Sequence, residues 1–193
     1  MSIQERRERE RAERHRLIVD AARALAEAEG WDAVTTRRLA ERVEYSQPVL
    51  YSHFKGKDAI VRAVAVQGSA DLAERLRAAR AAHRSPAAAL EAVARAYLDF
   101  AAARPALYDA MFVREVDLSF GTAESPPELL AAFGEFVAVV EPFAGGDDVE
   151  ALTEVLWSAL HGQATLDHGR RLRPDHREAR LELLLSRFTG RGR

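Results

Sequence analysis

One short segment, SQPVLYSHFKGKD at residues 46–58, gathers side chains suited to recognising a polyanion. It holds a proline, two aromatic residues, a histidine and both lysines of the protein, Lys55 and Lys57. Gln47 can form two hydrogen bonds with the edge of an adenine, and Val49 offers an apolar contact to a thymine methyl group. These residue types favour contact with the major groove of DNA.

Phosphates are the second target that this part of the chain can serve. The hydroxyl groups of Tyr51 and the nearby threonines, and the imidazole of His53, can donate to phosphate oxygens. Both lysines lie near the expected start of a helix, where a cation is mildly unfavourable. An anion docked there would make the placement of the lysines favourable. The candidate DNA contacts are Thr35, Thr36, Arg37, Gln47, Pro48, Val49, Tyr51, His53, Lys55 and Lys57.

Two short helices must position these side chains. Ser46 is expected to cap a helix that runs to about Phe54, because Pro48 is tolerated in a first turn. Leu50 and Phe54 are four residues apart and should point inward, which leaves the groove-reading residues outside. Thr35 or Thr36 can cap the short helix before it. This arrangement predicts a helix-turn-helix.

The stretch AVTTRRLAERVEYSQPVLYSHFKGKDAIV, residues 33–61, resembles the DNA-binding segment of the TetR family of bacterial transcriptional regulators. The shared pattern is T-x-R-x-[LI]-A, a short turn, and then S-x-x-x-[LV]-Y-x-[HY]-F-x-x-K. The resemblance implies a homodimer on a palindromic operator, with residues 47–49, 51 and 53 at the DNA and Thr36 and Lys57 at phosphates. The family usually has glycine where this chain has Glu44, and a left-handed backbone there would cost about 1 kcal/mol.

The remaining chain is expected to be helical as well. Apolar residues recur at helical spacing almost throughout, and alternating strand-like stretches are missing. We predict an all-α protein of about nine helices: an N-terminal arm with a three-helix helix-turn-helix domain at residues 1–57, and a larger ligand-binding and dimerisation domain at residues 58–193. Residues 1–16 mix both charges and are either a solvated helical extension or a disordered arm.

Several helix starts are marked by capping residues. Arg104-Pro105 is expected to interrupt a helix. The predicted N-caps are Ser85 before Pro86, Ser125 with Glu128, Asp147 with Glu150, and Asp175 with Glu178.

The last two long helices are expected to form a homodimer interface. The first of them is apolar on two sides, with one stripe at Leu152, Val155, Leu156 and Ala159 and a second at Trp157, Leu160, His161 and Ala164. The final helix carries Leu181, Leu184, Leu185 and Phe188. Two such helices from each of two chains would make a four-helix interface, which the resemblance also implies, and a two-fold dimer suits a two-fold operator.

A small-molecule effector is a further expected partner. Trp157-x-x-x-His161-Gly162 and the stretch at residues 104–112 resemble the WHG-type C-terminal domains of one branch of the family. Candidate lining residues are Tyr97, Phe100, Tyr108, Met111, Phe112, Phe133, Phe136, Trp157 and His161. The alternative is that most of these side chains are plain core.

Other classes of protein fit the sequence less well. With 28 basic and 30 acidic residues the net charge is -2, so DNA binding would need a local patch. The chain has no cysteine, and no apolar run approaches the roughly 20 residues of a spanning helix, so we expect a cytoplasmic protein without a membrane partner. We expect no cofactor and no enzyme, because His161 and His168 lie about two turns apart, too far to share a zinc ion. The main alternative is a helical homodimeric module that does not read DNA.

Overall fold

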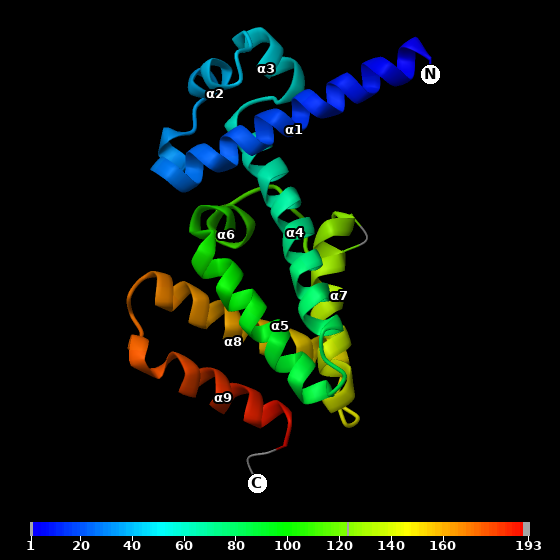
Figure 1. The fold of residues 1–193 in the computed structure, drawn as a ribbon, viewed down its shortest axis with the longest axis vertical. Coiled ribbons are helices and arrows are strands. Elements are labelled where there is room, and N and C mark those ends of the chain that lie inside the picture. The colour runs from blue at the N-terminus through cyan, green and yellow to red at the C-terminus, as the bar shows by residue number, and fades with distance from the viewer. Residues whose placement is uncertain (1, 123, 191–193) are drawn as a thin grey trace. The chain divides into compact units, whose positions relative to one another are not determined.

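The computed structural model describes residues 2–122 and 124–190, and within them the chain forms nine α-helices and no strand (Figure 1). The predicted all-α class is confirmed. The helices are α1 (Ile3–Glu29), α2 (Thr36–Arg42), α3 (Gln47–His53), α4 (Lys57–Ala81), α5 (Pro86–Ala103), α6 (Pro105–Phe112), α7 (Pro127–Val140), α8 (Val149–His168) and α9 (Arg177–Phe188), with 3-10 turns η1 (Trp31–Ala33), η2 (Glu141–Phe143) and η3 (Pro174–His176).

The chain divides into two compact units. Unit 1 comprises Met1–Gly68 and Arg104–Leu118, and unit 2 comprises Ser69–Ala103 and Ser119–Arg193. Helix α4 therefore gives its first part to unit 1 and its second part to unit 2. The division of function at residue 57 stays a prediction, while the compact N-terminal unit continues beyond that residue and also includes α6.

Unit 1 is built on one face of α1. Ile18, Ala22 and Leu25 are fully or almost fully buried and recur at helical spacing on this face. Leu39 of α2 and Leu50 of α3 are buried to the same degree, and α2 contacts both neighbouring helices of the motif. Burial of these side chains gives two seven-residue helices the tertiary support that helices of such length need.

Helix α6 joins unit 1 through polar contacts that complete its N-terminus. The Glu27 carboxylate of α1 accepts from the backbone N–H groups of Ala106, at 3.3 Å, and Leu107, at 2.9 Å. The indole Nε1 of Trp31 donates to the Ala106 carbonyl at 2.8 Å. A Cβ at Gly68 of α4 would lie 2.7 Å from both Leu107 Cδ1 and Met111 Sδ, so glycine lets these two side chains of α6 pack directly against α4.

Unit 2 packs α5 against α7 and α8. Leu90, Val93 and Tyr97 of α5 and Leu156 and Leu160 of α8 are fully buried at its centre.

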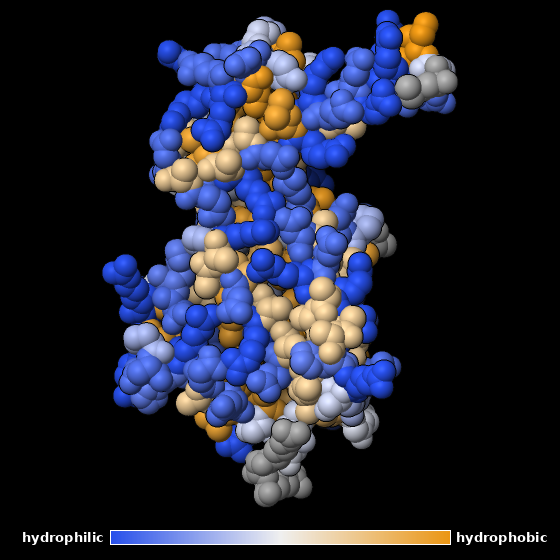
Figure 2. Space-filling model, in the orientation of Figure 1, coloured by the Kyte–Doolittle hydropathy of each residue, from blue (hydrophilic) through white to orange (hydrophobic). Residues whose placement is uncertain are grey.

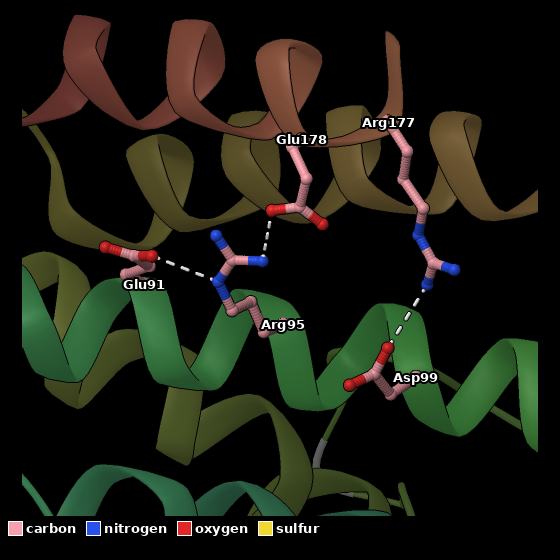
Figure 3. Close-up of polar contacts among 5 residues, drawn as sticks. All are labelled: Glu91, Arg95, Asp99, Arg177 and Glu178. Atoms are coloured by element: carbon pink, nitrogen blue, oxygen red, sulfur yellow. Dashed lines mark hydrogen bonds and ion pairs between the residues drawn. The ribbon is translucent and has the colours of Figure 1, made fainter. Parts of the chain in front are cut away.

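Ion pairs join two further pairs of helices within unit 2, α4 with α7 and α5 with α9. On α7, the buried carboxylate of Glu135 accepts from Arg77 Nε at 3.0 Å and from Arg80 Nε at 2.7 Å, both on α4. Between α5 and α9, Arg95 pairs with Glu178 at 2.5 Å and Arg177 with Asp99 at 3.2 Å (Figure 3).

The first turns of α1 are a solvated helical extension. Ser2 and Glu5 form a capping box, and pairs such as Arg6–Glu10 and Arg9–Glu13 link successive turns. In Figures 1 and 2 this end of α1 projects beyond α2 and α3 and presents a mostly hydrophilic surface. Of the two alternatives for residues 1–16, a solvated helical extension or a disordered arm, the described residues form the helical extension.

Two of the predicted helix boundaries are confirmed. Helix α5 begins at Pro86, and the Ser85 carbonyl accepts from Ala89 N–H at 2.9 Å. The break at Pro105 separates α5 from α6, as expected from the missing N–H of proline.

Three predicted N-caps are wrong because neighbouring residues take the position. Pro126 is the N-cap of α7, and the Ser125 hydroxyl instead accepts from Thr122 N–H at 3.0 Å in the preceding turn. Asp148, one residue after Asp147, caps α8 by accepting from Ala151 N–H at 2.9 Å. Asp175 lies inside η3, because Pro174 starts a 3-10 turn ahead of α9.

Candidate nucleic-acid interface

Helix α2 starts at a threonine cap. Thr35 has extended backbone angles, and its hydroxyl oxygen accepts from Arg38 N–H at 3.2 Å, as predicted. The next hydroxyl, of Thr36, lies 3.5 Å from the Tyr51 hydroxyl of α3. The start of α2 and the exposed side of α3 therefore bring two hydroxyl donors together.

The turn between α2 and α3 is a Schellman motif. Tyr45 N–H donates to the Ala40 carbonyl at 2.9 Å and Glu44 N–H to the Glu41 carbonyl at 3.4 Å. Glu44 occupies the left-handed position, with φ of 57°. The expected strain at this non-glycine residue is therefore present.

We expect Glu44→Gly to raise the free energy of unfolding by about 1 kcal/mol, because glycine adopts this conformation without a Cβ clash. Urea unfolding of the purified chain measures the change. Glu44→Ala is the matched control, since it removes the carboxylate and keeps the Cβ. Equal stabilisation by both variants would mean that charge, not backbone strain, is responsible.

Helix α3 has a buried inward face and an exposed outward face. Leu50 is 1% exposed, and Phe54, which ends the helix, is 4% exposed. Gln47 and Pro48 are exposed, and Tyr51 is 53% exposed. The outward positions predicted for Gln47 and Tyr51 are the observed ones, while their contact with a DNA groove stays a prediction.

Two other residues on α3 are half-buried. Val49 lies near the helix start. His53 at the far end has its ring centroid 6.4 Å from that of His15 on α1. Partial burial, followed by the charge of Arg11, lowers the pKa of His53. A neutral imidazole can donate one hydrogen bond to a phosphate, and a bound phosphate would favour its charged form.

The N-cap of α3 works differently from the prediction. The Ser46 carbonyl accepts from the N–H groups of Val49 and Leu50, at 3.1 and 3.2 Å, but its hydroxyl makes no capping bond. Pro48 removes one of the two N–H groups that an N-cap side chain normally binds. The helix start is thus stabilised through the backbone carbonyl.

The cations around α3 have unequal roles. Lys55 is exposed at the end of the helix. Lys57 Nζ donates to the Trp31 carbonyl at 2.6 Å, so this ammonium is also bonded to the η1 turn of the same unit. On α2, Arg37 is exposed and pairs with Glu41 at 3.0 Å.

A neighbouring pair on unit 1 was not predicted. Arg38 Nη1 and Nη2 donate to the two oxygens of Glu29 at 2.9 and 2.8 Å, a bidentate contact between α2 and α1. Hydrogen bonding to Arg38 lowers the pKa of Glu29. Nothing in the spacing of these residues could have revealed the pair, because the η1 turn lies between them.

The predicted effector-binding residues fall in both units. Tyr108, Met111 and Phe112 belong to unit 1, and the first two are buried. The members in unit 2 are Tyr97, Phe100, Phe133, Phe136, Trp157 and His161.

Within unit 2 one aromatic cluster is well defined. Trp157 Nε1 donates to the buried Tyr97 hydroxyl at 3.1 Å, and Phe136 meets the Tyr97 ring edge-to-face at 5.4 Å. The Trp157 and His161 rings lie 6.0 Å apart, and burial lowers the pKa of His161. This cluster is apolar with a few polar tips, and whether it binds a ligand stays a prediction.

Two family models match the chain. Residues 18–64 match the model described as bacterial regulatory proteins of the tetR family, and residues 90–188 match a tetracyclin repressor-like C-terminal domain. The second match alone covers more than half of the chain. The chain belongs to the TetR family of transcriptional regulators. The helix-turn-helix of unit 1 is accordingly the DNA-binding motif of a TetR-family protein.

Curated relatives agree with this membership. An HTH-type transcriptional regulator of Mycobacterium tuberculosis, Rv0681, is 31% identical over 152 residues, which cover 78% of this chain and 68% of that protein. YobS of Bacillus subtilis, another uncharacterized HTH-type transcriptional regulator, is 33% identical over 102 residues. That alignment spans only 53% of this chain and 53% of YobS.

Solved structures share the TetR-family fold at low identity. A Rhodococcus sp. RHA1 protein of unknown function has a TM-score of 0.76 at 23% identity, over 90% of this chain and 92% of its own. A TetR-family transcriptional regulator from Streptomyces coelicolor has a TM-score of 0.64 at 20% identity, over 92% and 98%. Within the described residues, none of the helices is long and apolar enough to cross a membrane.

Proposed function

We propose that this TetR-family regulator is a homodimeric repressor that binds a palindromic operator through two copies of α3. The observation that carries the proposal is the outward face of α3, where Gln47 and Tyr51 are exposed while Leu50 anchors the opposite side. A rigid helix with exposed side chains at its N-terminal end is the geometry by which helix-turn-helix proteins read base edges. The Thr36 hydroxyl, next to Tyr51, supplies a phosphate contact.

An exposed stripe on α8 supports the dimer. Val155 is 59% exposed and Leu166 is 42% exposed, and the two residues lie eleven positions apart on the same side of the helix. Ala159 and Gly162 fall between them on this side and are small enough for close helix contact. The inward stripe consists of Thr153, Leu156, Leu160 and Ala164. The two stripes thus differ in membership from the predicted ones, because α8 is rotated so that Val155 faces outward.

Helix α9 offers a matching outward position. Leu183 is 58% exposed, whereas Leu181 and Leu185 are buried against unit 2. A second copy that covered these exposed apolar side chains would remove them from water, which favours association. We infer that α8 and α9 of two copies pack together as a two-fold four-helix interface, which would hold the reading helices for half-sites about 34–36 Å apart.

The repressor role draws on relatives of the DNA-binding segment. Tetracycline repressor protein class D of Escherichia coli is 44% identical to this chain over 50 residues, which are 23% of that repressor. We infer that a small apolar effector binds near the Tyr97–Trp157 cluster and releases the DNA. Such a ligand would bind more tightly to the state in which the spacing of the two reading helices does not match the operator. The most by which it can lower the operator affinity is the difference between its affinities for the two states.

Selection of an operator from a random DNA library tests the proposal. The expected product is a palindrome whose half-site centres lie about one helical turn apart. A selected site without two-fold symmetry would overturn the dimeric mode of binding, and indifference to all duplexes would favour the helical module that dimerises without reading DNA.

Gln47→Ala is expected to weaken binding to the selected operator by about 1–3 kcal/mol and to relax preference at one base position of each half-site. The physical reason is loss of a bidentate contact with a base edge. Binding titrations against operators changed at single positions measure both effects.

Lys55→Ala is the matched control on the same surface. Loss of an exposed lysine that contacts a phosphate should weaken binding to all duplexes alike. It should also reduce the salt dependence of binding by roughly one unit of slope per half-site. If Gln47→Ala weakened every duplex equally as well, Gln47 would be a backbone contact and the proposed reading role would fail.

A further inference from the structure

A pocket of about 220 Å³ opens between α5, α8 and α9 of unit 2. Its lining residues are Leu98, Ala101, Ala102, Gln163, Ala164, Asp167, His168, Arg177 and Arg180. No residue of the predicted effector set belongs to this lining. The pocket is therefore separate from the aromatic cluster around Tyr97.

The lining combines an apolar wall with converging donors. Leu98, Ala101 and Ala102 supply the wall on α5. Arg177 and Arg180 bring two guanidinium groups from α9, against the single carboxylate of Asp167 among the lining residues. Such a set of donors matches an acceptor group that carries negative charge.

Arg180 is held in place but incompletely satisfied. Its Nη1 donates to the Arg173 carbonyl at 2.7 Å, which orients the guanidinium plane. Its Nε is buried without a hydrogen-bond partner, and its Nη2 lies 3.7 Å from Asp167 Oδ1, too far for a hydrogen bond. The Nε–Nη2 edge, the edge that binds carboxylates in a bidentate fork, therefore lacks a good acceptor.

The second guanidinium is also oriented by the fold. Arg177 Nη2 donates to Asp99 on α5 at 3.2 Å (Figure 3). This contact joins α5 to α9 beside the pocket and uses one of the three guanidinium nitrogens of Arg177.

We propose that this pocket binds a small organic monocarboxylate, whose carboxylate takes the Nε–Nη2 edge of Arg180 and displaces Asp167 from its long contact. The apolar part of the ligand lies against the α5 wall. An engineered apolar cavity of about 150 Å³ accommodates benzene, so a pocket of this size suits an acid as large as benzoate. The proposal goes beyond operator binding and does not depend on it.

Isothermal titration calorimetry of the full chain with sodium benzoate, without DNA and at constant ionic strength, tests the site. We expect one saturable site per chain with a Kd on the order of 1 mM or tighter. Benzamide has the same shape without the charge and should bind at least about 10-fold more weakly. Butyrate and hexanoate report whether the apolar part must be aromatic.

Four variants separate the pocket from the surrounding ion pairs. Arg180→Met should lose at least about 10-fold in benzoate affinity, and Arg180→Lys should recover only part of it because ammonium cannot form the fork. Asp167→Asn removes the competing carboxylate and should tighten binding. Arg95→Met breaks the contact to Glu178 outside the pocket (Figure 3) and should leave binding unchanged. Circular dichroism of each variant tests whether it is folded.

Four results would each overturn the proposal. They are no saturable binding of any of the three acids up to about 10 mM, equal affinity for benzoate and benzamide, full affinity in Arg180→Met, and an equal loss of affinity in Arg95→Met. The last result would assign the effect to the attachment of α9. Because the readout contains no DNA, failure here leaves operator binding untouched, and failure of operator selection leaves this test intact.

Discussion

A Val155→Glu chain is expected to sediment as a monomer and to bind a two-half-site operator about 10²–10⁴-fold more weakly than the parent chain. Val155 is 59% exposed on the outward stripe of α8, where a second copy would cover it. A carboxylate in that position would be buried without a partner in the dimer, which is strongly unfavourable. Loss of the dimer removes the advantage of joining two half-sites in one complex.

Analytical ultracentrifugation and operator titration measure the two effects on the same sample. Leu130→Glu is the matched control, because Leu130 is 47% exposed on α7, outside the proposed interface. Binding to a single half-site duplex should stay the same in both variants. A dimeric Val155→Glu chain, or a Leu130→Glu chain that dissociates equally, would contradict the α8–α9 interface.

Leu50→Ala is expected to lower the free energy of unfolding by about 2–5 kcal/mol, the range for a buried leucine truncated in a core. Leu50 is 1% exposed and anchors a reading helix of only seven residues, which cannot stay helical without tertiary contacts. Urea unfolding followed by circular dichroism measures the loss.

The control for this cavity is Leu50→Met, which nearly conserves volume and should cost less than about 1.5 kcal/mol. Operator affinity should fall with Leu50→Ala in proportion to the population of misplaced α3, and recover in Leu50→Met. A loss under about 1 kcal/mol in Leu50→Ala would mean that α3 is not held by this side chain.

Much of the DNA-binding motif was predictable because its determinants are local. The Thr35 cap, the inward pair Leu50 and Phe54, and the exposed Gln47 all follow from helix periodicity and capping within a few residues. The strain at Glu44 followed from the family pattern and matches its φ of 57°. Arg170, at φ of 53° after α8, has the same left-handed conformation, which was not predicted.

Capping signals were less dependable where several candidates are adjacent. Asp147 and Asp148 have the same intrinsic ability to cap a helix. Helix α8 begins at Val149, so Asp148 is the N-cap. Likewise the orientation of α8 determined which apolar stripe faces outward, because both stripes have helical spacing. Packing against α5 and α7 buries Leu156 and Leu160, and Val155 then has to face outward.

By itself the sequence determined the all-α class, the helix-turn-helix and the choice of side chains that α3 presents, because each depends on residues within one or two helical turns. Only the tertiary structure decided that α6 joins the N-terminal unit, where Glu27 and Trp31 bind its first backbone groups across about eighty residues of chain. It also decided that Arg180 has an unsatisfied edge in a pocket between three helices. Contacts between distant segments depend on how the helices pack, and neither periodicity nor capping specifies that packing.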